Sequence, residues 1–291
     1  MDSVRCRALL AAVDEGTISK AAEKLGYTPS GVSQLITALE DDLGFPVVDR
    51  GRRGVRPTEA GRKMLPAMRE FVEREENIYQ LAGEINGLEI GSVTIGTYPS
   101  VSAQWLPDVI REFEKKYPGI EIRLLEGIRQ EICTWLDERT CDLGFITYWE
   151  PMEYDWFPLA EDPMIAVLPK DHPRAEDRSY PVRECSREDF IMPAMGHDVD
   201  VERLMEKYDV DLNVKYQTFE NGATIALIEK GLGMSVMNEL CTLSWLTDAV
   251  KLPLDPPESV TLGIALPSYD HATPAVRKFV DLAAMALTKE E

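Results

Sequence analysis

The stretch AAEKLGYTPSGVSQLITALEDDLG, residues 21–44, predicts two helices joined by a tight turn. The first helix contains the small pair Ala21-Ala22, which lets a neighbouring helix approach closely, and it ends at Gly26. Thr28 is a favoured N-cap and Pro29 a favoured first helical residue, so a second helix begins there. Apolar residues recur along that helix at spacings of four, three and four and predict one buried stripe: Val32, Ile36, Leu39 and Leu43. This pattern describes a helix-turn-helix.

The other faces of the second helix carry short hydroxyl and amide side chains. Such groups donate and accept hydrogen bonds at base edges and phosphates, and a helix N-terminus favours phosphate. Extended segments at 45–49 and 54–57 then flank Arg50-Gly51-Arg52-Arg53, which is typical of a β-wing with arginines that reach the DNA backbone or minor groove. An arginine cluster alone is also compatible with a solvated loop, but beside this helix pair it favours DNA binding. The residues expected to contact double-stranded DNA are Thr28, Pro29, Ser30, Ser33, Gln34, Thr37, Arg50, Arg52 and Arg53.

Charge is distributed unevenly along the chain. The 291 residues include 51 acidic and 31 basic residues, for a formal net charge of −20. Residues 1–63 contain ten basic and nine acidic residues, a net charge of +1, so the remaining 228 residues carry −21. The total opposes a polyanionic partner, whereas the N-terminal part by itself does not.

Composition and motif searches exclude several classes of protein. With 44% hydrophobic and 28% charged residues, the chain is neither disordered nor collagen-like. We expect a cytoplasmic protein without a membrane partner, because the sequence contains no apolar run of about 18 to 20 residues and no secretory signal. The three histidines and five cysteines show no metal-ligand spacing, so neither a metal nor a cofactor is expected. Enzymatic activity is not expected either, because no acid–base pair, nucleophile elbow or phosphate loop occurs at a diagnostic spacing.

Several separate motifs occur in the order found in one known family. Their sum resembles the N-terminal winged helix-turn-helix of LysR-type transcriptional regulators, and the matching segments are 21–25, 28–33, 39–44, Arg50 and 58–61. The family often has Gln-Pro where this chain has Pro29-Ser30, Arg in place of Gln34 and Leu in place of Pro57. The resemblance implies a DNA-binding transcriptional regulator controlled by a small-molecule effector. It also implies that Ser30, Ser33 and Gln34 face the major groove, and that Arg50 and Arg53 touch the DNA backbone.

A long helix is predicted after the wing, over residues 59–88. Apolar residues recur in it at alternating spacings of four and three, interrupted by one glutamate: Met64, Met68, Phe71, Glu75, Ile78, Ala82 and Ile85. Such a seam predicts a dimerisation helix that places two DNA readers on a two-fold-symmetric site, with packing on its own domain as the alternative. The family resemblance implies a homodimer, a homotetramer built as a dimer of dimers, and RNA polymerase as a further partner.

The acidic remainder alternates strands and helices with short links, which predicts a parallel sheet covered on both faces. Two such series indicate two lobes joined by two crossings, near Glu161-Asp162 and Pro267-Ser268. The predicted fold is therefore α/β overall. It consists of an all-α winged helix-turn-helix (1–58), a long linker helix (59–88) and a two-lobed α/β periplasmic-binding-protein-like effector domain (89–291). Lobe I covers about 89–161 and 268–291, and lobe II about 162–267.

Ligands in such sheets bind beyond the carboxyl ends of the strands. The residues expected there are Tyr98, Ser100, Ser102, Ile128, Thr147, Met192, Pro193, His197, Asn221 and Asn238. Hydroxyls at a helix N-terminus suit a carboxylate, so a small organic or aromatic acid is the expected effector, although Ser100 and Ser102 also read as plain N-caps. One alternative is a redox-sensing regulator of the same fold that uses Cys185 and Cys241. Another is a clamp-type enzyme or binding protein fused to a DNA reader.

Overall fold

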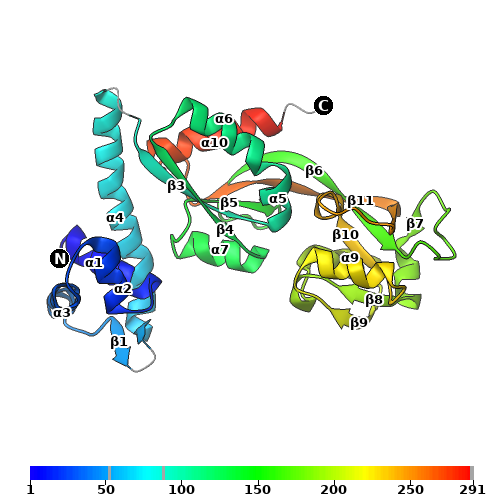
Figure 1. Ribbon diagram of the computed structural model, residues 1–291, viewed down its shortest axis with the longest axis horizontal. Helices are drawn as coiled ribbons and strands as arrows, with labels where there is room; N and C mark the ends of the chain where they lie inside the picture. The colour runs from blue at the N-terminus through cyan, green and yellow to red at the C-terminus, as the bar shows by residue number, and fades with distance from the viewer. Residues whose placement is uncertain (52–53, 87–88, 289–291) are drawn as a thin grey trace.

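The computed structural model describes residues 1–51, 54–86 and 89–288, which form three consecutive parts (Figure 1). A small N-terminal domain surrounds one end of the long helix α4 (Glu59–Ile85), and the other end of α4 lies beside the first of two α/β lobes. The N-terminal domain consists of α1 (Ser3–Asp14), α2 (Ile18–Leu25), α3 (Pro29–Leu43), β1 (Val48–Gly51) and β2 (Gly54–Pro57). The predicted order of a winged helix-turn-helix, a linker helix and a two-lobed domain is confirmed. No helix of the described residues is long and apolar enough to cross a membrane.

Local signals in the sequence account for the helix pair. Thr28 caps α3 by accepting a hydrogen bond from the Gly31 backbone N–H at 3.1 Å. Gly26 ends α2 in the left-handed conformation, with φ of 70°, which is the region where glycine is favoured. The apolar stripe of α3 is buried against α1, as predicted, and the shared core includes Leu9, Val32, Ile36 and Leu39.

The predicted seam along α4 is divided between two surroundings. Met64 and Met68 pack against the core of the N-terminal domain, and Glu75 accepts hydrogen bonds from Ser3 and Arg7 of α1. The remaining apolar positions face solvent, and Ile78 and Ile85 are 67% and 87% exposed. The prediction of one continuous seam for a partner helix was therefore wrong for its first half, because these methionines complete the core of their own domain. The exposed half consists of Phe71, Ile78, Ala82 and Ile85.

Lobe I holds the far end of α4 through several polar contacts. The buried Gln80 side chain accepts a hydrogen bond from the Ala275 backbone N–H at 3.2 Å. Lys278 forms an ion pair with Glu84 at 2.6 Å, and Arg139 contacts Glu73 at 3.5 Å. These contacts tie lobe I, rather than lobe II, to the linker helix.

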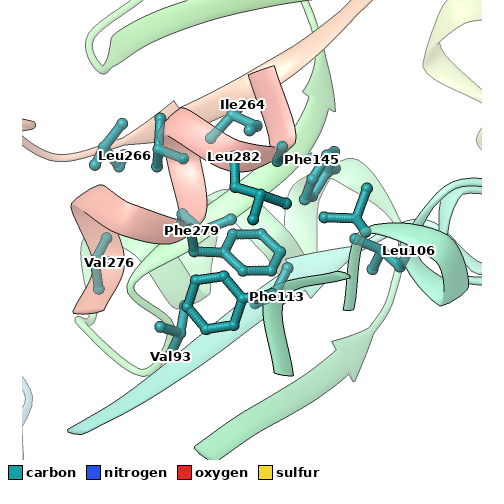
Figure 2. Close-up of a cluster of buried hydrophobic side chains, with 14 of the residues drawn as sticks. Val93, Leu106, Phe113, Phe145, Ile264, Leu266, Val276, Phe279 and Leu282 are labelled. Carbon is teal, nitrogen blue, oxygen red and sulfur yellow. The ribbon is translucent and has the colours of Figure 1, made fainter. Parts of the chain in front are cut away.

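Lobe I is built on parallel strands. Strand β3 pairs in parallel with β4 on one side and β5 on the other. Helix α10 returns from the C-terminal region to cover this sheet (Figure 2), where Phe279 packs edge-on against Phe113 at a centroid distance of 5.2 Å. The elements are β3 (Gly91–Thr97), α5 (Pro99–Gln104), α6 (Leu106–Lys116), β4 (Ile120–Glu126), α7 (Arg129–Asp137), β5 (Leu143–Thr147) and α10 (Pro274–Leu287).

Lobe II contains the second series of strands and helices. Its main strands continue the same sheet in the order β10-β6-β11, while β8 and β9 form a separate parallel pair. The elements are β6 (Asp155–Leu168), β7 (Tyr180–Pro181), β8 (Asp189–Met192), α8 (Val199–Tyr208), β9 (Asn213–Gln217), α9 (Asn221–Glu229), β10 (Ser235–Asn238) and β11 (Val250–Leu266).

The two lobes are joined by two long antiparallel strands, β6 and β11, which run from one lobe into the other (Figure 1). Glu161-Asp162, where the first crossing was predicted, lies within β6. The second was predicted near Pro267-Ser268, and this is wrong: Thr261 is the partner of Glu161, and Leu262 already pairs with Thr147 of lobe I. Two paired strands pass from one lobe into the other at residues that lie side by side, so lobe II ends near residue 260.

Candidate DNA interface and interlobe cleft

The recognition surface lies on the exposed side of α3. Thr28, Pro29, Ser30, Gln34 and Thr37 are exposed, and the side chain of Ser33 is half-buried. The Ser30 and Thr28 hydroxyls lie 3.1 Å apart at the start of the helix. Hydroxyl and amide groups thus gather at and after the N-terminus of one helix, where they can meet phosphates and base edges.

Arg50 from the wing lies across this surface. Its guanidinium donates to Ser33 Oγ at 2.8 Å and to Thr37 Oγ1 at 3.2 Å, and it forms an ion pair with Glu40 at 3.0 Å. Glu40 also accepts hydrogen bonds from the backbone N–H groups of Val47 and Val48. Arg50 was predicted to touch the DNA backbone, whereas here it joins the wing to α3. Arg52 and Arg53 lie outside the described residues.

A cleft of about 450 Å³ lies between the two lobes. This volume is within the range of small-molecule sites. Seven of the expected effector residues line it from both lobes: Tyr98, Ser100, Ile128, Thr147, His197, Asn221 and Asn238. Their convergence follows from the carboxyl ends of the strands meeting at one edge of each lobe.

Three expected residues lie outside the cleft. Ser102 is on the opposite side of α5 from Ser100 and Ala103, which are three residues apart and face the cleft together, and its hydroxyl is buried without a hydrogen-bond partner among the described residues. Met192 packs in the core of lobe II, and Pro193, the buried residue after strand β8, does not reach the cleft. The prediction of these three as ligand contacts was wrong, because the end of a strand does not fix which side chains are free of the core.

Hydrogen bonds across the cleft connect the lobes. Asp200 at the start of α8 accepts from Thr147 Oγ1 at 3.2 Å and from Trp149 Nε1 at 3.3 Å. Farther along, Gln104 Nε2 donates to Ser244 Oγ at 2.6 Å. The relative position of the lobes therefore depends on polar contacts at the same cleft that a ligand would occupy.

Two arginines from different lobes lie over the indole ring of Trp149. The guanidinium of Arg129, from α7, stacks over the indole at 3.8 Å from the ring centroid, and that of Arg203, from α8, at 4.7 Å. Stacking of this kind holds an arginine in place without neutralising it. Arg129 and Trp149 line the cleft, and sequence reasoning had not selected Arg129 because an arginine in a surface helix gives no distinct signal.

Carboxylates are the other group that sequence reasoning missed. The cleft is also lined by Glu126, Asp162, Asp198, Asp200 and Glu220. Burial raises the pKa of Asp162 and of Asp198 to about 6 in each case. In a chain with 51 acidic residues, no spacing distinguishes these five from the rest before the fold brings them together.

The cysteines of the redox alternative are not brought together. Cys185 is fully buried in the cluster that contains Met164, Ala166 and Leu168, whereas Cys241 packs with Ile165 and Val167. Alternate residues of a strand point to opposite faces, so the two thiols lie on opposite sides of β6. Burial also raises the pKa of both thiols to about 12, which disfavours the reactive thiolate.

A helix-turn-helix reader, a linker helix and a two-lobed clamp with a ligand-sized cleft define a ligand-responsive transcriptional regulator. Residues 4–62 match the family model of bacterial regulatory helix-turn-helix proteins of the lysR family, and residues 86–288 match that of the LysR substrate binding domain. The chain belongs to the LysR family of transcriptional regulators, which confirms the resemblance drawn from the motifs.

Individual relatives extend over the whole chain. The HTH-type transcriptional regulator YvbU of Bacillus subtilis is 31% identical over 275 residues, which is 93% of each chain. Among solved structures, a full-length OxyR variant of Pseudomonas aeruginosa has a TM-score of 0.80 at 19% identity, covering 99% of this chain and 95% of that one. The effector binding domain of QuiR in complex with shikimate has a TM-score of 0.63 at 19% identity, covering 69% of this chain and 99% of that domain. At these identities the two structures establish the fold.

Proposed function

We propose that the cleft between the lobes is the effector site of this LysR-type regulator, and that occupation of the cleft changes how two copies of the reader domain sit on DNA. The proposal rests on the cleft, because its volume suits a small ligand and its lining residues come from both lobes. The effector class we expect is a small organic acid, since Arg129 and the Ser100 hydroxyl offer groups that bind a carboxylate. The related fold of the QuiR domain takes shikimate.

The coupling follows from the contacts already described. A ligand that replaces or strengthens the bonds of Asp200 to Thr147 and Trp149 favours one relative position of the lobes. Lobe I is held to α4 through Gln80 and Glu84, so a change in lobe position alters the forces on the linker helix. In a dimer formed through α4, this changes the spacing of two reader domains on a two-fold-symmetric DNA site.

A gel-shift experiment tests the DNA-binding part. The full chain should shift DNA from the region upstream of its own gene better than random DNA, and the shift should weaken with salt. Gln34→Ala should reduce the preference for that DNA, because each base contact contributes about 1–3 kcal/mol of discrimination. Lys115→Ala, on helix α6 of lobe I and outside the reader domain, is the control. Equal competition by random DNA would contradict the proposal.

Ser100→Ala tests the cleft. Removal of one hydroxyl at the cleft should weaken effector-dependent transcription about tenfold, since a hydrogen bond to a charged ligand contributes about 1.5–3 kcal/mol. DNA binding without effector should stay unchanged, because Ser100 is far from the reader domain. Reporter assays and thermal unfolding of the purified variant provide the two measurements. Ser102→Ala, on the opposite side of the same helix, is the control that should leave the response intact. If the parent protein and the two variants respond equally to the effector in the reporter assay, Ser100 is not part of the site.

A further inference from the structure

We propose that the ligand of the interlobe cleft is an organic acid that also carries an ammonium group, so that its two charges meet opposite charges on the two walls of the cleft. This inference rests on the proposed effector role of the cleft and narrows the class of molecule that it takes. It follows from three features of the cleft: a carboxylate wall, the guanidinium of Arg129, and aromatic side chains in the lining.

The carboxylate wall consists of Asp162 and Asp198. Asp162 lies on β6 at the first crossing between the lobes and is only 5% exposed, and its Oδ1 accepts a hydrogen bond from the Leu240 N–H at 3.1 Å. Asp198 caps α8 by accepting from the Val201 N–H at 3.2 Å. Each carboxylate is therefore held in place, and each lines the cleft.

Neither carboxylate of this wall has an ion-pair partner in the described part of the chain. Within residues 1–51, 54–86 and 89–288, neither Lys nor Arg forms an ion pair with Asp162 or Asp198. Two further glutamates of the lining add negative charge along the cleft, whereas Arg129 is the one guanidinium or ammonium group among its described lining residues. Asp200 is not part of this wall, because it accepts hydrogen bonds from Thr147 and Trp149, the same two residues that Arg129 contacts. Desolvated like charges repel one another, so a cation that enters between them is favoured by all of them.

An inorganic metal ion does not fit this wall. Among the described residues, no group of three or more His, Cys, Asp or Glu side chains is arranged so that it could hold a metal ion. Metal ions require ligand oxygens at a common centre, whereas an ammonium group donates three separate hydrogen bonds to acceptors that are farther apart. The geometry therefore favours an organic cation.

The opposite wall supplies the site for the carboxylate. Arg129 donates weakly to the Thr147 carbonyl at 3.4 Å and stacks on Trp149, and it has no ion-pair partner among the described residues. Ser100 lies on the same lobe and also faces the cleft. A guanidinium and a hydroxyl from lobe I, opposite carboxylates that belong to the crossing and to lobe II, suit a ligand with both charges.

Aromatic side chains also line the cleft. Trp149, Trp245, Tyr98 and Phe219 all contribute to the cleft. Their surfaces suit an apolar or aromatic body between the two ends of the ligand. Carboxylates, a guanidinium and aromatic side chains in one cleft together suit an amino acid. A purely anionic acid should therefore bind more weakly than an amino acid of the same shape.

Two matched sets of compounds test the charge requirement by calorimetry and thermal unfolding of the full chain. One set is L-phenylalanine, 3-phenylpropionate and phenethylamine, and the other is L-tryptophan, indole-3-propionate and tryptamine. In at least one set, the compound with both charges should bind about tenfold more tightly than either compound with a single charge, which corresponds to one decade in Kd. The proposal is overturned if the acids bind as well as the amino acids in both sets, or if no compound binds at about 10 mM.

Variants separate this inference from the function on which it rests. Asp162→Asn and Asp198→Asn keep an amide oxygen for their backbone hydrogen bonds, and together they should remove the preference for the amino acid while acid binding is kept or improved. Asp189→Asn, an acidic residue of lobe II that pairs with Lys215 outside the cleft, should change nothing. If an acid binds best and Ser100→Ala weakens it, the cleft stands as the effector site and the ammonium requirement fails. If the variants of the cleft alter no binding at all, the effector role of the cleft fails as well.

Discussion

Ile78→Asp is expected to dissociate the regulator into monomers and to reduce its affinity for operator DNA by about 10²- to 10⁴-fold, the range by which linked binding exceeds single binding. Ile78 is 67% exposed in one chain and lies in the free half of the α4 seam, with Phe71 and Ile85 seven residues away on either side. An apolar stripe of this regularity is suited to a second copy of the same helix. A carboxylate in its centre would have to be buried without a partner in the dimer, which is strongly unfavourable.

Analytical ultracentrifugation measures the first effect and a DNA titration the second. Val214→Asp is the matched control, because Val214 is also an exposed apolar residue but lies on β9 of lobe II. The control should keep both the mass and the affinity of the unchanged protein. A variant at Ile78 with the oligomeric mass of the parent would show that the exposed seam is not where the copies meet.

Gly61→Ala is expected to destabilise the N-terminal domain by about 1–3 kcal/mol, the usual effect of overpacking a close contact, and to lower DNA binding with it. Gly61 is in the first turn of α4, where a Cβ atom would lie 2.0 Å from the carbonyl oxygen of Val47. That carbonyl already accepts a hydrogen bond from the Thr58 N–H at 3.1 Å, so the backbone at this point cannot move away without losing the bond. The close approach fixes the linker helix to the start of the wing.

Gly51→Ala provides the comparison, because a Cβ at Gly51 in β1 has no neighbour within 4 Å among the described residues. Thermal unfolding should show a lower transition for the Gly61 variant alone. Unfolding temperatures that agree between the two variants would mean that α4 can shift away from Val47 at little cost, and that the wing is less firmly joined to the linker than the contact indicates.

The helix pair of the N-terminal domain was predictable because its signals are local, whereas the first strand of the wing, expected at 45–49, is at 48–51. A cap at Thr28, a proline at the next position and an apolar spacing of four and three residues each act within one or two turns of helix. Local signals of this kind could not show which apolar residues of the α4 seam are buried in the N-terminal domain and which are exposed. Met68 and Ile78 both belong to the repeat, and only the packing of α1 decides that the first is buried in its own domain and the second is exposed.

The cleft was predictable in its location and less so in its chemistry. Strand ends that meet at one edge of a sheet led to Ser100, Thr147 and Asn221, whereas Ser102 and Met192 share that position in the sequence but point away from the cleft. The boundary between the lobes could not be predicted from local signals either. The residue at which β11 passes from lobe II into lobe I is set by its pairing with β6.

The sequence by itself determined that this chain is a helix-turn-helix reader with a linker helix and an α/β clamp, because caps, turns and periodic apolar residues act over short distances. Tertiary structure alone decided which charges face one another. Asp162 and Asp198 lie far apart along the chain among many other acidic residues, and folding places both on the cavity that Arg129 also lines. Electrostatic character depends on distances in space, so the net charge of −20 says nothing about this site until the lobes are assembled.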